Sequence, residues 1–175
     1  MPTESLEPAE VLTTIDETVA RLSGLVSPIG EEEINSVPYE NSWTAGELLS
    51  HITKSLSGIA EAMTIPGKPA KRNPGEKVAD FKKTFLDFSI QMTSPDFIIP
   101  DRKNYDKISA LDELTMAAER LKENTNNAAM ADIVENLPMG EVTKLELLHF
   151  ALYHTQRHLH QMHKICDALK AVKRK

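Results

Sequence analysis

The chain has 175 residues, of which 41% are hydrophobic and 26% are charged, and its formal net charge at neutral pH is -6. This length suits one domain with its own core, and the composition is that of a globular protein, neither disordered nor embedded in a membrane. The acidic balance disfavours nucleic-acid binding, because nucleic-acid-binding proteins concentrate positive charge against phosphates. Cys166 is the only cysteine and residues 1–10 lack a secretory-signal pattern, so we expect a single cytoplasmic domain over residues 1–175.

Four long segments show apolar residues at helical spacing, and none shows the repeated short alternation of an all-β protein. The expected long helices cover residues 8–25, 44–65, 109–124 and 143–169. In the long connection after the second helix, residues 67–75 form an expected exposed connector, and residues 76–92 contain a short helix followed by irregular chain. We therefore predict an all-α four-helix bundle of the up-and-down type, with an additional short helix and an irregular segment in that connection.

Two of the long helices begin with the same capping pattern, T-x-x-E. The first box pairs Thr44 with Glu47, and the second pairs Thr143 with Glu146. In such a box the threonine caps the first turn and the glutamate bonds back to the backbone of the cap. Trp43 precedes the first box and is expected to pack against the first turn as a hydrophobic staple, in preference to a role in a ligand site.

Two short basic stretches stand out from the acidic background. They are KPAKR at residues 68–72 and KAVKRK at residues 170–175. The second lies at a helix end, where positive charge is favourable to the helix dipole. Both are interpreted as solvated charge and not as nucleic-acid-binding surfaces.

Residues 149–163 hold five of the six histidines. At about 100° per residue, His154 and His158 fall one turn apart on the apolar stripe of the last helix. Cys166 also falls on an apolar side and is expected to be an inert core cysteine. The side expected to face water carries the remaining histidines and their neighbours: Glu146, His149, Tyr153, Arg157, His160, His163 and Lys164.

Two interpretations fit the pair His154 and His158. Buried imidazoles need hydrogen-bond partners, which backbone carbonyls or the rings themselves supply in an ordinary core. Alternatively, the ring nitrogens converge on a metal ion. His51 is the one histidine left to complete such a site, but helical phasing puts it just outside the stripe of its helix, where a boundary residue is equally consistent.

Two stretches resemble the DinB-like superfamily of helical bundles. SWTAGELLSHI at residues 42–52 is similar to that family's second helix, in which a tryptophan precedes a helix carrying a ligand histidine. LPMGEVTKLELLHFALYHTQRHLHQM at residues 137–162 is similar to its last helix, whose H-x-x-x-H-x-x-Q ending matches His154, His158 and Gln161. The resemblance implies a four-helix bundle with a mononuclear divalent metal site made by His51, His154 and His158.

Proteins of this kind include bacterial thiol S-transferases that use bacillithiol, mycothiol-dependent isomerases, and members described as metal-dependent hydrolases or as DNA-damage-inducible. The resemblance thus implies hydrolysis or thiol transfer on a small electrophilic substrate, with zinc, nickel or iron as the ion and a low-molecular-weight thiol as a possible second substrate. Three imidazoles leave a coordination position open, as catalytic sites require. Family members often pair, so a homodimer is a further expectation.

The roles of two residues and two other function classes stay open at this point. Glu47 suits a role in orienting His51 or as a base, although its capping role is the simpler explanation, and Gln161 suits a supporting role better than that of a ligand. A second function class is a non-catalytic metal-binding or interaction bundle, in which the ion is structural. A third is a DNA-associated protein, which the acidic balance opposes.

Overall fold

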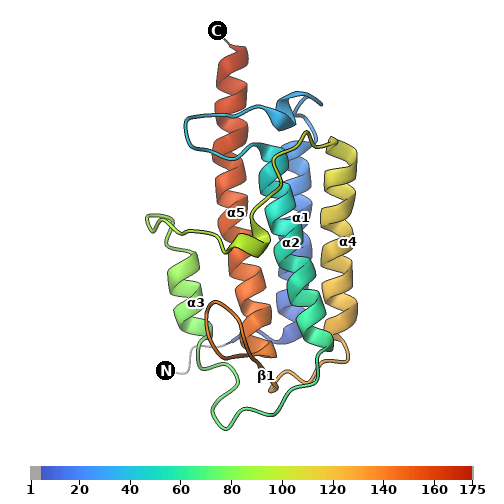
Figure 1. The fold of residues 1–175 in the computed structure, drawn as a ribbon, viewed down its shortest axis with the longest axis vertical. Coiled ribbons are helices and arrows are strands. Elements are labelled where there is room, and N and C mark those ends of the chain that lie inside the picture. The colour runs from blue at the N-terminus through green and yellow to red at the C-terminus, as the bar shows by residue number, and fades with distance from the viewer. Residues whose placement is uncertain (1–4, 175) are drawn as a thin grey trace.

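The computed structural model describes residues 5–174, and four long helices dominate it (Figure 1). The long helices are α1 (Pro8–Val26), α2 (Ala45–Thr64), α4 (Lys107–Thr125) and α5 (Lys144–Lys173). The shorter elements are η1 (Glu33–Asn35), α3 (Val78–Phe85), η2 (Asp96–Ile98), β1 (Ile133–Val134) and β2 (Val142–Thr143). The predicted helical bundle with one additional short helix is confirmed, and the two antiparallel strands add only a small hairpin.

The expectations drawn from the chain ends extend beyond the part that the structure describes. Residues 1–4 of the acidic amino terminus and Lys175 of the basic carboxyl-terminal stretch lie outside the described residues. Within residues 5–174, no helix is both long enough and apolar enough to cross a membrane.

The four long helices do not alternate in direction along the chain. The end of α4 meets the end of α2, where Asn124 Nδ2 donates to the Ala60 carbonyl oxygen at 2.7 Å, so these helices run parallel. The end of α1 likewise meets the later half of α5, where Cys166 Sγ lies 3.6 Å from the Leu25 carbonyl oxygen. This differs from the expected up-and-down order, because the connection over residues 65–106 carries the chain back along the bundle before α4 begins (Figure 1).

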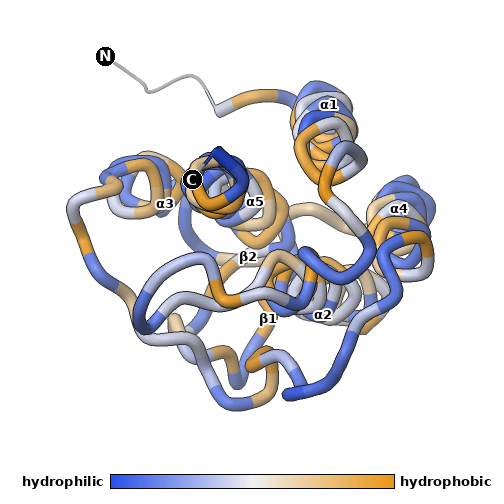
Figure 2. The backbone as a smooth tube through the Cα atoms, turned by 90° about the horizontal axis from the view of Figure 1, so that it is seen from above, coloured by the Kyte–Doolittle hydropathy of each residue, from blue (hydrophilic) through white to orange (hydrophobic). Residues whose placement is uncertain are grey.

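One hydrophobic core lies between the long helices, and their apolar residues face it (Figure 2). On α1, the side chains spaced three or four residues apart are buried as the pattern predicts: Val11, Ile15, Val19 and Leu22. Seen end-on, α3 lies outside the four-helix arrangement, against α5 (Figure 2). Helix α5 therefore has neighbours on several sides, namely α1, α2 and α3.

An ion pair between a buried carboxylate and a partly buried guanidinium holds the connector after α2 against the start of α5. Arg72 Nη1 and Nη2 donate to the two carboxylate oxygens of Glu146 at 2.6 and 2.7 Å. The same carboxylate accepts the backbone N–H groups of Lys77 and Thr143, each at 2.9 Å. The expectation that Glu146 faces water is therefore wrong. In the basic stretch at residues 68–72, Lys68 and Lys71 are exposed as expected, whereas Arg72 is half-buried in this ion pair. The reason is that the connector folds back over the first turn of α5, which helical phasing within one segment does not reveal.

Candidate metal centre

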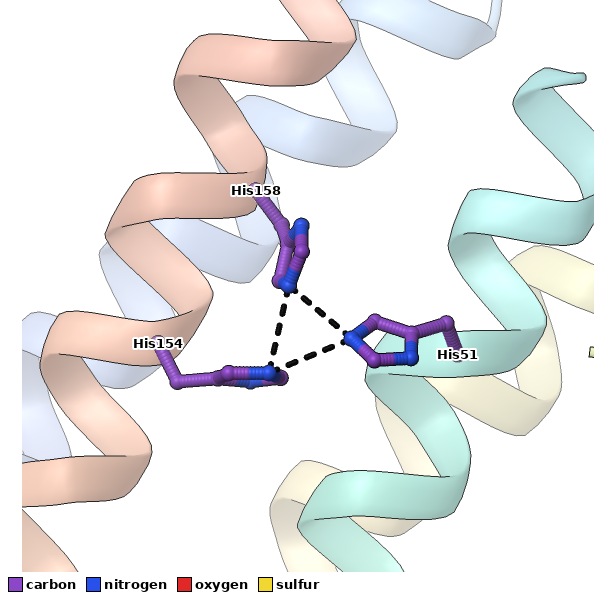
Figure 3. A group of neighbouring side chains, drawn as sticks. All are labelled: His51, His154 and His158. Carbon is purple, nitrogen blue, oxygen red and sulfur yellow. Dashed lines mark hydrogen bonds between the residues drawn. The ribbon is translucent and has the colours of Figure 1, made fainter. Parts of the chain in front are cut away.

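Three histidine side chains from two antiparallel helices meet inside the bundle (Figure 3). His51 projects from α2, while His154 and His158 project from successive turns of α5. The Nε2 atoms lie 2.9 Å apart for His51 and His158, 3.1 Å for His154 and His158, and 3.2 Å for His51 and His154. The ring of His51, which phasing placed at the edge of its stripe, is 1% exposed.

The outer ring nitrogens show where two of the imidazoles carry their protons. His51 Nδ1 lies 2.9 Å from the Ile98 carbonyl oxygen, and His158 Nδ1 lies 2.9 Å from Gln161 Oε1. Both oxygens only accept hydrogen bonds, so in a neutral ring each Nδ1 donates and each Nε2 presents a lone pair. Two lone pairs then face each other across 2.9 Å, an arrangement that is repulsive unless a cation lies between them.

Burial keeps all three rings neutral at physiological pH. Desolvation lowers the pKa of His51, although the bond to the Ile98 carbonyl opposes this shift. Desolvation, with a smaller effect of the neighbouring imidazoles, brings the pKa of His154 well below its usual value. Burial lowers the pKa of His158 to about 3. Neutral imidazole is the form that binds a metal ion, so no proton has to leave before an ion binds here.

The three nitrogens have the spacing that one divalent ion requires. Imidazole nitrogens bind zinc at about 2.0–2.1 Å, which places nitrogens sharing one tetrahedral ion about 3.3 Å from one another. The observed separations of 2.9 to 3.2 Å are close to this value and slightly shorter. Among residues 5–174, these histidines form the one group of three or more histidine, cysteine or acidic side chains that is close enough to hold an ion. The three buried histidines can therefore bind a metal.

The opposite side of α5 is less exposed than helical phasing predicts. His149 is fully buried and Tyr153 is 5% exposed, so the expectation that both face water is wrong. The segment that precedes α1 reaches His149 through the backbone of Leu6, and the connector near Gly75 lies against the same end of α5. Burial lowers the pKa of His149 accordingly. A helix with neighbours on both sides has no outer face in its first half, and its own sequence pattern does not report the second neighbour.

Two other predictions for α5 are confirmed. His163 is exposed, and Cys166 is 1% exposed, with burial raising the pKa of its thiol to about 11. A thiol that stays protonated is an inert core group. His160 is only half-buried, and its ring stacks on that of Phe88 with centroids 4.0 Å apart.

The two residues considered for supporting roles lie in different settings. Gln161 contacts His158 directly through the 2.9 Å bond described above. Glu47 is engaged in the capping box, where its Oε2 accepts the Thr44 N–H at 2.9 Å. The outer nitrogen of His51 is held by Ile98 and not by Glu47.

Sequence analysis missed two contacts of His51. The Ile98 carbonyl comes from η2, 47 positions along the chain, and no sequence signal identifies a backbone oxygen as a partner at that separation. The Trp43 ring centroid lies 4.9 Å from that of His51, and Trp43 also lines the neighbouring cavity. Trp43, for which a staple was preferred over a role in a ligand site, therefore contacts the candidate centre as well. Its position just before a histidine-bearing helix was the available signal.

A cavity of about 930 Å³ adjoins the histidines, and His154 and His158 form part of its lining. This volume is within the range of small-molecule sites. On one side of the cavity, Arg157 of α5 holds the end of α3 in place by donating to the carbonyl oxygens of Phe85 and Asp87 at 3.2 and 3.0 Å. Beyond the histidines the lining is largely aromatic and aliphatic, and it includes Phe85, Met92, Phe97, Leu137, Met139 and Phe150.

The sequence of this chain matches the model of a known protein family. The model of the DinB superfamily matches residues 14–162, which include all three histidines. The chain belongs to the DinB superfamily. A search of curated proteins by sequence found no match.

Two solved structures have a similar fold. TT2238, described as a four-helix bundle protein, aligns with 90% of this chain and 98% of its own, with a TM-score of 0.58 and 16% identity. YfiT from Bacillus subtilis, described as a probable metal-dependent hydrolase with an unusual four-helix bundle topology, aligns with 94% of this chain and 90% of its own, with a TM-score of 0.59 and 14% identity. At these identities the likeness establishes the four-helix-bundle fold alone.

Proposed function

We propose that this DinB-superfamily chain is a metal-dependent enzyme in which His51, His154 and His158 hold one divalent ion, which is zinc, nickel or iron. The observation that carries the proposal is the meeting of three buried, neutral Nε2 atoms within 3.2 Å of one another. The reaction is hydrolysis, or transfer of a low-molecular-weight thiol, at a small electrophilic substrate. The description of YfiT as a metal-dependent hydrolase is consistent with this proposal.

The cavity favours a catalytic ion over a structural one. Structural sites are closed by four protein ligands, whereas catalytic sites keep a position open to water or substrate. Here the protein offers three nitrogens, and two of the histidines line a cavity large enough for a small molecule. A divalent ion held in this way makes a bound water or thiol more acidic and thus more nucleophilic at neutral pH.

Neighbouring residues orient the histidines and shield them from water. Ile98 fixes the His51 ring through its carbonyl oxygen, and Gln161 fixes the His158 ring through its side-chain oxygen. These bonds keep both protons on Nδ1, so the Nε2 lone pairs stay directed into the centre. The Phe150 ring stacks on His154 with centroids 5.3 Å apart and limits the access of bulk water from that side.

The first experiment measures metal content by mass spectrometry on protein purified without a histidine tag. We expect one divalent ion per chain in the wild-type protein and its loss in His51→Ala and in His154→Ala. His163→Ala is the matched control, because His163 lies on the same helix but is exposed. Stoichiometric metal in both His51→Ala and His154→Ala would sink the proposed centre.

A second experiment separates a catalytic ion from a structural one. The wild-type protein is depleted with a chelator, and circular dichroism is recorded beside turnover of p-nitrophenyl butyrate and thiol conjugation of monochlorobimane. We expect the activity that the wild-type protein shows, hydrolysis or conjugation, to require the ion. The helical signal should persist, because the large apolar core does not depend on the three histidines. Unfolding on depletion, or equal activity without metal, would favour the non-catalytic alternative.

A further inference from the structure

One face of α2 leads from the candidate centre into the cavity. His51, Ser55 and Ala62 are buried on this face, at helical spacing. Gly58, seven residues after His51, lies on the same face, yet it is exposed and forms part of the cavity lining. The helix thus presents no side chain at one position directly along the line from the histidines.

Neither backbone conformation nor packing requires a glycine at position 58. A Cβ built on Gly58 would meet no atom within 4 Å, and the one glycine with positive φ among the described residues is Gly140. Gly46 of the same helix differs, because its Cβ would lie 2.8 Å from the Cβ of Tyr105. Glycine inside a helix is less favourable than alanine. What the missing side chain leaves at Gly58 is free volume in the cavity.

The cavity wall that α5 forms before His154 is apolar, whereas the wall that α2 forms is mixed. On α5 these lining residues are Leu147 and Phe150, while on α2 Ser55, Ser57 and Glu61 line the cavity beside Ile59 and Ala62. With a helical rise of 1.5 Å per residue, the lining extends roughly 10 Å along α5 from His154 to Leu147. The lining on α5 also continues past His154 through Arg157 and His158 to Gln161, so the space is elongated along the helix and the candidate ion lies partway along it.

The two cationic side chains in the lining are occupied by the protein itself. Lys54 Nζ donates to the Ile99 carbonyl oxygen at 2.9 Å and lies 3.4 Å from the Asp101 carboxylate. Arg157 is committed to backbone carbonyl oxygens, as described above. A ligand that lies along the α5 wall therefore meets apolar side chains and no free cation, and Glu61 on the α2 wall disfavours an anionic group, so the site favours an uncharged apolar group.

We propose that the substrate carries an elongated, uncharged apolar group, such as an alkyl chain or an aryl group, which extends from the reacting bond over Gly58, and that Gly58 sets the size of this group. This inference rests on the proposed function, since it places the reacting bond at the three histidines. It assigns to Gly58 the role of a specificity-determining residue.

Straight-chain hydroxamates of increasing length test the proposal on the zinc-loaded protein, because the head group binds the metal and only the tail varies. Dissociation constants are measured by titration calorimetry from acetohydroxamate to octanohydroxamate. Each methylene that becomes fully buried improves the dissociation constant by about fourfold. We expect an overall gain on the order of a hundredfold, with some of the tail left partly exposed.

Variants at position 58 test the assigned role of the glycine. In Gly58→Phe and in Gly58→Leu, we expect acetohydroxamate to bind as in the wild type while the gain with chain length is lost. Gly24→Phe is the matched control, because Gly24 is an exposed helical glycine with no atom within 4 Å of a built Cβ, but it lies outside the cavity lining. We expect Gly24→Phe to keep the full chain-length gain.

The outcomes separate this inference from the proposed function. If acetohydroxamate binds but affinity does not rise with chain length, the apolar substrate group is refuted and the metal centre stands. A gain that persists in Gly58→Phe and Gly58→Leu refutes the role of Gly58. If acetohydroxamate does not bind, the metal centre fails, and the neutral dye N-phenyl-1-naphthylamine then decides the inference on metal-free protein. Enhanced fluorescence that is lost in Gly58→Phe supports the apolar site, and the absence of enhancement in the wild type overturns it.

Discussion

The beginnings of α2 and α5 share one local motif but differ in what the rest of the molecule does with it. Thr44 with Glu47 and Thr143 with Glu146 both complete a capping box. Glu47 is only half-buried, and its carboxylate bonds to its own cap residue. Glu146 is fully buried, and its carboxylate also accepts hydrogen bonds from Arg72. A capping box that is recognisable in sequence therefore contributes an amount of stability that depends on the residues packed around it in the folded protein.

The difference matters because the two helices carry the candidate centre together. Helix α5 supplies two of the three histidines, and its first turn is tied to the connector that follows α2. The Glu146 carboxylate accepts two hydrogen bonds from Arg72 and two from backbone N–H groups, whereas the Glu47 carboxylate accepts one from the Thr44 backbone N–H. Stability should therefore respond very unequally to the same substitution at the two sites.

Glu146→Gln should have the largest effect in this comparison. It removes the charge that compensates the partly buried Arg72, and breaking such a pair costs about 3 kcal/mol in the free energy of unfolding. Glu47→Gln is the matched variant and should cost less than about 1 kcal/mol, the scale of a single cap. Urea denaturation followed by circular dichroism measures both. Equal losses would show that the buried ion pair adds nothing to the cap.

The acid dependence of stability should differ in the same direction. Burial alone would raise the pKa of Glu146, but the bonds from Arg72 and the two backbone N–H groups outweigh it and hold the pKa below its usual range. The unfolded chain then takes up the proton first, so the stabilisation is present at neutral pH and is lost as the pH falls through the lowered pKa.

Urea denaturation at several pH values between neutral and acidic measures this dependence. Glu146→Gln should lose less stability on acidification than the wild type does, because its amide has no proton to take up. Glu47→Gln should keep a slope close to that of the wild type. A wild-type slope in Glu146→Gln would contradict the prediction.

The smallest difference is expected between the two threonine caps. Thr44→Ala should cost about 1 kcal/mol, because one backbone N–H loses its acceptor. Thr143→Ala should cost roughly 1 kcal/mol more, because the Thr143 hydroxyl also donates to the partly buried carbonyl oxygen of Pro74. The substitution leaves that oxygen without this donor. Thermal unfolding of the two variants measures the difference, and identical melting temperatures would show that the bond to Pro74 contributes nothing.

The helices themselves were predictable because their signals are local. Proline at the first turn, two capping boxes and apolar residues every three or four positions predicted four long helices, and α1 begins at Pro8 as expected. The direction of α4 was not predictable, since the route of the connection over residues 65–106 depends on what it packs against. Short-range periodicity carries no information about that route.

The candidate centre divides in the same way. Helical phasing brought His154 and His158 to one side of α5, but His51 joined them only through the family resemblance. The orienting carbonyl of Ile98 and the free volume at Gly58 were found only in the structure. Both depend on segments far apart in the sequence that pack against α2.

The amino-acid sequence by itself thus determined the helical bundle, its capped helix starts and the paired histidines of α5, since these depend on neighbours within one or two turns. Tertiary structure decided which of the two identical caps anchors a connector, why His149 and Tyr153 are buried, and where the cavity lies. Those features depend on packing between segments far apart in the chain. Burial there changes the energetic contribution of a charged or aromatic side chain, so residues of the same type in similar motifs contribute differently.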